Sequence, residues 1–144
     1  MTDSSSIRVL VVGAGHMGIS HARAYSKLNG FEICGVVTRS LASSQAMVDE
    51  LGPFPQYIDF EEALRKTNPD AVSINSYTES HHPFTLSALD AGCHVFVEKP
   101  LAETVEKAQE IADKAKSTGR KVLVGYILRH HPSWIRFIEI AHEL

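Results

Sequence analysis

Residues 9–18 read VLVVGAGHMG, and this stretch decides the fold of the chain. An apolar run typical of a buried strand leads into a Gly-x-Gly-x-x-Gly turn, and a helical pattern follows at once. In such a turn Gly13 permits the sharp exit from the strand, and Gly18 lets the helix pack closely on that strand. Gly15 has no side chain, so a pyrophosphate can approach the backbone and the free N–H groups of the helix N-terminus.

The turn therefore predicts a dinucleotide site, and the alternative is a glycine-rich turn that binds no ligand. Its position after an apolar strand and before a helix favours the dinucleotide, because the same glycines in another context would be a weak signal. The cofactor contacts predicted in this stretch are Gly13, Gly15, His16, Met17 and Gly18.

Strand and helix signals alternate along the rest of the chain. Predicted strands cover residues 7–12, 31–37, 56–58, 71–74, 94–98 and 122–126. Predicted helices cover residues 16–28, 41–51, 60–66, 105–118, 132–144 and a segment from 82 or 83 to 91, and Ser40, Asp59 and Thr104 are predicted N-caps. Because each helix carries the chain back across the sheet, the strands pair in parallel. Right-handed crossovers then predict a doubly wound α/β sheet of strand order 3-2-1-4-5-6, with ligands at the carboxyl ends of the strands.

The composition is that of one globular domain. The 144 residues are 44% hydrophobic and 22% charged, and the net charge of -3 argues against a nucleic-acid partner. The sequence has neither a signal peptide nor a run of the roughly 20 apolar residues that a membrane span requires. Cys34 and Cys93 lie in apolar stretches and are predicted to be small buried hydrophobic residues in a reducing compartment. We therefore expect a cytoplasmic protein with no membrane partner.

The end of the second strand bears on the choice of dinucleotide. NAD-binding folds of this kind place an acidic residue there to bind the ribose 2′-hydroxyl, but no Asp or Glu occurs between Glu32 and Asp49. The strand instead runs into Thr38, Arg39 and Ser40. Arg39 would attract a 2′-phosphate and could stack on adenine, and the two hydroxyl groups add donors. We predict contacts from all three and a preference for NADP over NAD; the alternative is a solvated Arg39 beside a helix cap.

Two later segments, GCHVFVEKPLA at residues 92–102 and VGYILRHHP at 124–132, add a family signature. Together with the glycine turn they closely resemble the Gfo/Idh/MocA oxidoreductase family, from residue 7 to the end of the chain. The serine run at residues 4–6 predicts a flexible lead over residues 1–6, and the resemblance implies an NAD(P)-binding Rossmann domain over residues 7–131. It also implies a reaction in which hydride passes between a nicotinamide cofactor and a sugar, a cyclitol or a related hydroxy compound.

The resemblance implies roles for four residues near the nicotinamide. Lys99 matches the catalytic lysine that reaches the substrate oxygen, where an ammonium can donate a proton or stabilise developing negative charge. Glu98 matches the residue beside the nicotinamide ribose, and Lys99 also counts among the cofactor contacts. Pro100 matches a proline often preceded by a cis bond, which would aim Lys99 into the cleft. Arg129 matches the arginine on the nicotinamide side, with a salt bridge to Glu98 or another carboxylate as its alternative role.

The loop after the fourth strand matches the family only in part. Asn75 and Ser76 are predicted cofactor contacts, but Tyr77 stands where the family usually has proline. His81 matches the histidine of the family's Thr-Pro-Asn-x-x-His pattern and is predicted to contact the cofactor; equally, it could be a helix-start residue satisfied by local backbone. Adjacent histidine pairs at 81–82 and 130–131 lack a Cys or carboxylate at ligand spacing, so no metal site is predicted.

Proteins of this family carry a second domain that supplies much of the substrate pocket, and this sequence ends before it. We expect residues 132–144 to begin a linker helix towards that missing C-terminal domain, and the chain to be a fragment inactive by itself. The apolar side of this helix would pack on the chain's own surface or on another copy of the chain, as in a homo-oligomer, or the helix would fray. The alternative function is a non-catalytic dinucleotide sensor on the same fold. Among enzymes, a Rossmann reductase of amino-acid or bilin metabolism is the second choice.

Overall fold

The computed structural model describes residues 6–143, and its centre is a six-stranded parallel sheet. The strand order β3-β2-β1-β4-β5-β6 confirms the predicted doubly wound topology. The predicted flexible lead, apart from Ser6, lies outside the described residues. The strands are β1 (Ile7–Val12), β2 (Phe31–Val37), β3 (Gln56–Tyr57), β4 (Ala71–Ile74), β5 (His94–Val97) and β6 (Val122–Val124).

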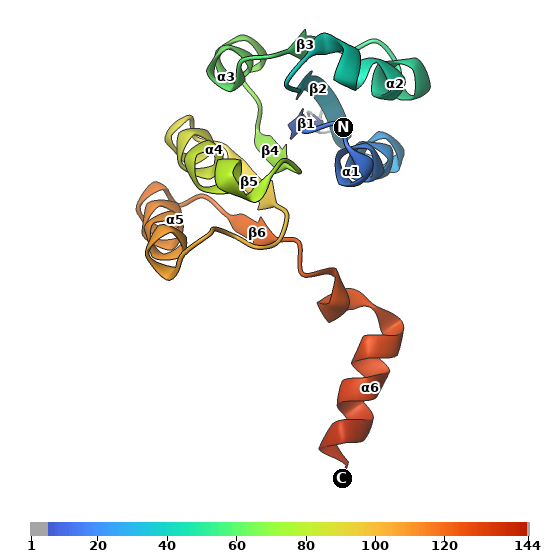
Figure 1. The fold of residues 1–144 in the computed structure, drawn as a ribbon, viewed down its shortest axis with the longest axis vertical. Helices are drawn as coiled ribbons and strands as arrows, with labels where there is room; N and C mark the ends of the chain where they lie inside the picture. Colours follow the sequence, from blue (N-terminus) through green and yellow to red (C-terminus); the bar gives the residue numbers. More distant parts are fainter. Residues whose placement is uncertain (1–5, 144) are drawn as a thin grey trace, which may run out of the picture.

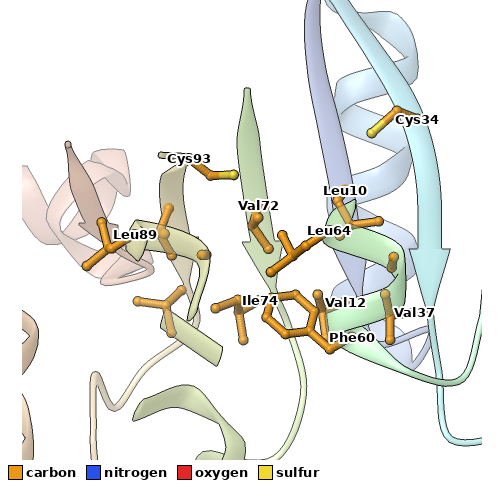
Figure 2. Packing of buried hydrophobic residues seen from close by; sticks show 14 residues of the cluster. Leu10, Val12, Cys34, Val37, Phe60, Leu64, Val72, Ile74, Leu89 and Cys93 are labelled. Atoms are coloured by element: carbon orange, nitrogen blue, oxygen red, sulfur yellow. The ribbon is translucent and has the colours of Figure 1, made fainter. Parts of the chain in front are cut away.

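Helices cover both faces of the sheet, as Figure 1 shows. One face carries α1 (His16–Lys27) and α2 (Leu41–Leu51), and the other carries α3 (Phe60–Thr67), α4 (Thr78–Asp90) and α5 (Val105–Thr118). Because side chains of a strand alternate between the faces, β1 divides its apolar run between two core clusters. Leu10 and Val12 pack on the α3 and α4 side together with Phe60 (Figure 2), and Val9 and Val11 pack on the α1 and α2 side.

The start of α4 is the main difference from the predicted elements. The helix begins at Thr78, four residues before the predicted start at residue 82. Pro83 is typical of a first helical turn, but here it lies inside the helix. Because proline has no N–H group, the helix loses one backbone hydrogen bond. The burial of side chains at helical spacing on both sides of Pro83 offsets this loss. The buried residues are His81, Thr85, Ala88 and Leu89.

The other differences are at element ends. The sheet pairs β6 only with β5 over three residues, so the strand stops at Val124, and a 3₁₀ turn that was not predicted, η1 (Ile127–His130), follows. Asp59 and Thr104 accept hydrogen bonds from the first turns of α3 and α5, which confirms both N-caps. Ser40 is the N-cap residue of α2 as predicted, but its side chain makes no capping bond, because its hydroxyl pairs with the Ser43 hydroxyl at 2.8 Å.

The last helix, α6 (Pro132–His142), lies apart from the sheet in Figure 1 and buries none of its residues. Its aromatic rings, Trp134 and Phe137, stack on each other at 5.4 Å between centroids. Packing of this helix on the chain's own sheet, one of the three expected outcomes, is therefore not observed. Within residues 6–143, no helix has both the length and the apolar character needed to cross a membrane.

Both cysteines are buried and free, as predicted. Burial raises the pKa of the Cys34 thiol, and it raises the pKa of Cys93 to about 11. The Cys93 thiol also donates a hydrogen bond to the Pro69 carbonyl oxygen at 3.2 Å.

This thiol makes stability depend on alkaline pH. In the unfolded chain a cysteine ionises near pH 8.5, whereas Cys93 in the folded chain keeps its proton up to about pH 11. The folded state therefore binds more protons between these values, and the free energy of unfolding falls as the pH rises through them. Urea unfolding at pH 8, 9 and 10 measures the fall, and Cys93→Ala is expected to make it shallower. An unchanged slope in that variant would show that Cys93 contributes nothing to it.

Candidate functional site

A pocket of about 840 Å³ opens at the carboxyl ends of β1, β2 and β4, where the strand order reverses. Its walls come from the glycine turn after β1, the ends of β2 and β4, and the first turns of α3 and α4. This is where doubly wound sheets bind their ligands. Eight predicted cofactor contacts line it: Gly13, Gly15, His16, Met17, Thr38, Arg39, Asn75 and Ser76.

The three glycines of the turn have different surroundings. Gly13 has φ +94°, and a Cβ there would lie 2.7 Å from the Asn75 carbonyl oxygen. A Cβ on Gly18 would lie 2.0 Å from the Gly13 carbonyl oxygen, so the start of α1 packs directly on the turn. A Cβ on Gly15 would meet no atom within 4 Å, although this residue lines the pocket. Close backbone packing therefore excludes a side chain at Gly13 and Gly18, whereas Gly15 leaves space for a ligand.

The N-terminus of α1 is open to an anion. Its N-cap residue Gly15 offers no side chain, and the first turn holds no acidic residue. The first N–H groups of a helix have no intrahelical acceptor, and the helix dipole adds positive charge at this end. Backbone N–H groups of His16 and Met17 are thus available to a phosphate beside Gly15.

Asn75 at the end of β4 presents an unpaired acceptor in the same pocket. Its amide nitrogen donates to the Ser73 carbonyl and hydroxyl oxygens, at 3.0 and 3.1 Å. Its Oδ1 is buried and has no hydrogen-bond partner among the described residues. Buried polar atoms are usually paired, so this oxygen fits a ligand that brings a hydroxyl or amide donor.

At the end of β2, only one of the three predicted contacts presents its polar group to the pocket. Thr38 is buried, and its hydroxyl donates to the Ser40 carbonyl oxygen at 2.7 Å. Ser40 lies outside the pocket lining and pairs with Ser43. Arg39 is exposed, and its guanidinium lies over the ring of Tyr77, with Cζ 4.9 Å from the centroid. Tyr77 was not a predicted contact and stood out in the sequence only as a departure from the family pattern.

A second cluster lies at the end of β5. Glu98 is buried, and its Oε1 lies 2.9 Å from Nε2 of His21 on α1. The backbone N–H of Lys99 donates to the other carboxylate oxygen at 3.3 Å. A Cβ on Gly125 would lie 3.2 Å from the Glu98 carboxyl carbon, so glycine after β6 makes room for this carboxylate. His21 was not among the predicted site residues, although its place one turn after Gly18 on the sheet side of α1 is a signal for it.

Lys99 follows Glu98 and is exposed to solvent, outside the lining of the pocket. The Lys99–Pro100 peptide bond is cis, which confirms the expectation from the family resemblance. Arg129 on η1 lies over the ring of Tyr126, with Cζ 5.6 Å from the centroid, rather than in a salt bridge with Glu98.

His81 occupies a different place from the predicted loop. It lies in the second turn of α4, is 1% exposed and does not line the pocket. Nδ1 lies 2.7 Å from the Pro100 carbonyl oxygen, and Nε2 lies 3.1 Å from that of Ser76. The ring thus joins the loops after β4 and β5 through backbone contacts. The Ser76 contact is the local one that the alternative for this residue expected, and the Pro100 contact, 19 residues away, was not expected.

His82, the neighbour of His81, contacts a carboxylate on another helix. Nε2 of His82 lies 2.7 Å from the Glu110 carboxylate on α5. Across residues 6–143, no group of three or more His, Cys, Asp and Glu side chains is placed to hold a metal ion.

Comparison with known proteins gives one family. Residues 7–126 match the Gfo/Idh/MocA family model, described as an oxidoreductase family with an NAD-binding Rossmann fold. The chain is 36% identical over 129 residues to D-glucoside 3-dehydrogenase of Escherichia coli K12, covering 89% of this chain and 36% of the relative. It is 32% identical over 133 residues to inositol 2-dehydrogenase of Agrobacterium fabrum, covering 90% and 40%. The chain thus spans well under half the length of these curated relatives.

A solved dehydrogenase structure has the same fold over nearly the whole of this chain. The scyllo-inositol dehydrogenase of Lactobacillus casei, crystallised with NAD(H) and scyllo-inositol, superposes with a TM-score of 0.87 at 26% sequence identity. The match covers 96% of this chain and 41% of that one. The likeness therefore includes nearly every element described above.

Proposed function

We propose that residues 7–131 bind a nicotinamide dinucleotide for hydride transfer, because this chain belongs to the Gfo/Idh/MocA oxidoreductase family. The substrate class we propose is a sugar, a cyclitol or a related hydroxy compound, which is what the names of its curated relatives suggest. One observation carries the proposal: the pocket at the strand-order reversal combines a side-chain-free Gly15 with an uncapped helix N-terminus. Both features suit a pyrophosphate.

The pocket residues fit such a cofactor. The N–H groups of His16 and Met17 would bind the phosphates, and Asn75 Oδ1 would accept a hydrogen bond from the ligand. When bound, the nicotinamide ring supplies or accepts the hydride. Lys99 would donate a proton to the substrate oxygen or take one from it, and its ammonium would stabilise negative charge there. Glu98, fixed by His21, would lie beside the nicotinamide ribose.

NADP is the proposed preference within this cofactor class. The carboxylates in the pocket wall, Asp59, Glu61 and Glu79, come from the starts of α3 and α4, and Asp59 is engaged as the cap of α3. None stands at the end of β2, where an acid would bind a ribose 2′-hydroxyl. Arg39 stands there instead, and its guanidinium suits a 2′-phosphate.

We expect Arg39→Ala to weaken NADPH binding by about 1.5–3 kcal/mol, or about 10- to 150-fold, because one charge-assisted contact is lost. NADH has no 2′-phosphate, so its affinity is expected to stay within about twofold. Fluorescence titration of both coenzymes measures this. Arg136→Ala on α6 is the matched control, since it removes the same charge far from the pocket. Tighter binding of NADH than NADPH by the unaltered chain would reject the preference, and binding of neither would reject the function.

A further inference from the structure

The contact between Arg39 and Tyr77 spans the mouth of the pocket. Arg39 follows β2 and Tyr77 is the N-cap residue of α4, which follows β4, while β1 lies between these two strands. The two side chains therefore meet above the carboxyl end of β1, where the glycine turn begins. Both line the pocket.

The contact has two components. The guanidinium lies over the aromatic face, with Cζ 4.9 Å from the ring centroid. One terminal nitrogen, Nη2, also donates to the Tyr77 hydroxyl oxygen at 3.3 Å. An arginine that stacks through its flat face keeps the N–H groups along its edge free for another acceptor. This arrangement therefore holds the cation without using up its remaining donors.

The exposure of Arg39 and Tyr77 explains how their contact could affect anion binding. Tyr77 is 63% exposed, and Arg39 is exposed as well, so neither residue is fixed by the core. An unrestrained arginine loses rotamer freedom when it binds an anion, and a partner that holds it beforehand removes part of that cost. A tyrosine ring at this position is suited to that task.

We propose that Tyr77 is a specificity-determining residue that holds the Arg39 guanidinium over the pocket to receive a 2′-phosphate. The inference rests on the proposed preference for NADP. It assigns Tyr77 no contact with the reacting atoms, and its effect on binding acts through Arg39. The Tyr77 ring should therefore raise the affinity for NADPH and leave the affinity for NADH unchanged.

The test is a double-mutant cycle on coenzyme affinity. Tyr77→Ala is expected to weaken NADPH binding about two- to fivefold, the range of an exposed cation–π pair, and to leave NADH unchanged. Tyr77→Phe keeps the aromatic face and is expected to bind NADPH within about twofold of the unaltered chain. In the Arg39→Ala background, Tyr77→Ala should have no further effect, because the residue it positions is gone. Adenosine 2′,5′-bisphosphate, which lacks the nicotinamide, should follow the NADPH pattern.

The other outcomes are distinguishable. An equal loss of NADPH and NADH in Tyr77→Ala would mean that the ring contacts the part common to both coenzymes, and this would overturn the inference. An unchanged NADPH affinity in Tyr77→Ala, or the same loss with and without Arg39, would also overturn it. If the unaltered chain binds NADH more tightly, the NADP preference itself fails before Tyr77 is considered. Thermal unfolding of each variant checks that the exposed substitutions leave the fold intact.

Discussion

Replacing Gly18 with alanine is expected to lower the free energy of unfolding by about 3 kcal/mol, the upper end of the usual overpacking range. Helix propensity alone predicts the opposite, since alanine inside a helix is favoured over glycine by about 1 kcal/mol. The new Cβ, however, would lie 2.0 Å from the carbonyl oxygen of Gly13 and 2.7 Å from its carbonyl carbon. Both are backbone atoms of a turn that also packs on Asn75, so no side-chain rotation can relieve the overlap. The start of α1 has to move away from β1.

Gly15→Ala is the matched control, because it adds the same atom three residues earlier at the same helix end. A Cβ there meets nothing within 4 Å, and its φ of -74° is one that any residue adopts. We expect its free energy of unfolding to stay within about 1 kcal/mol of the unaltered chain. Urea unfolding of the three proteins measures both effects. Equal stability of the two alanine variants would show that the close packing of α1 on the glycine turn is wrong.

The arrangement of the sheet could be predicted from the sequence because its signals are local. Residues 9–12 of β1 form an unbroken apolar run because helices cover them on both faces, and each helix that follows a strand forces parallel pairing. The start of α4 was placed too late because Pro83 is a strong local signal, whereas the burial of His81 that extends the helix depends on tertiary packing.

The backbone part of the candidate site was equally predictable. Gly13, Gly15 and Gly18 are each explained by a separate steric demand of the turn. The side-chain pairs were not predictable, because they join elements far apart in the chain. Arg39 meets Tyr77 across 38 residues, and His21 meets Glu98 across 77. Only the positions of the strands bring such partners together.

The buried orientation of the Thr38 side chain was also not predicted. Its hydroxyl satisfies the Ser40 carbonyl oxygen, a backbone acceptor two residues away, so it is not a free donor for a ribose or a phosphate. Small hydroxyl side chains commonly bond to nearby backbone in this way. Arg39, which is too long to do so, is left to face the pocket.

Replacing Gly15 with valine should separate binding from folding. The two added methyl groups would enter the open space in front of the α1 N-terminus, where we propose that the pyrophosphate lies. Phosphate oxygens could then no longer approach the backbone N–H groups of His16 and Met17, and charge-assisted hydrogen bonds contribute about 1.5–3 kcal/mol each. The loss of two such bonds corresponds to more than about 100-fold in affinity.

Calorimetric titration of NADPH into the unaltered chain and into Gly15→Val, with urea unfolding of both, decides whether a dinucleotide binds against this turn. We expect saturable binding to the unaltered chain, affinity reduced by more than about 100-fold in the variant, and unfolding free energies within about 1 kcal/mol of each other. Equal NADPH affinity in two equally stable proteins would contradict the assignment of the pocket beside Gly15 to the coenzyme.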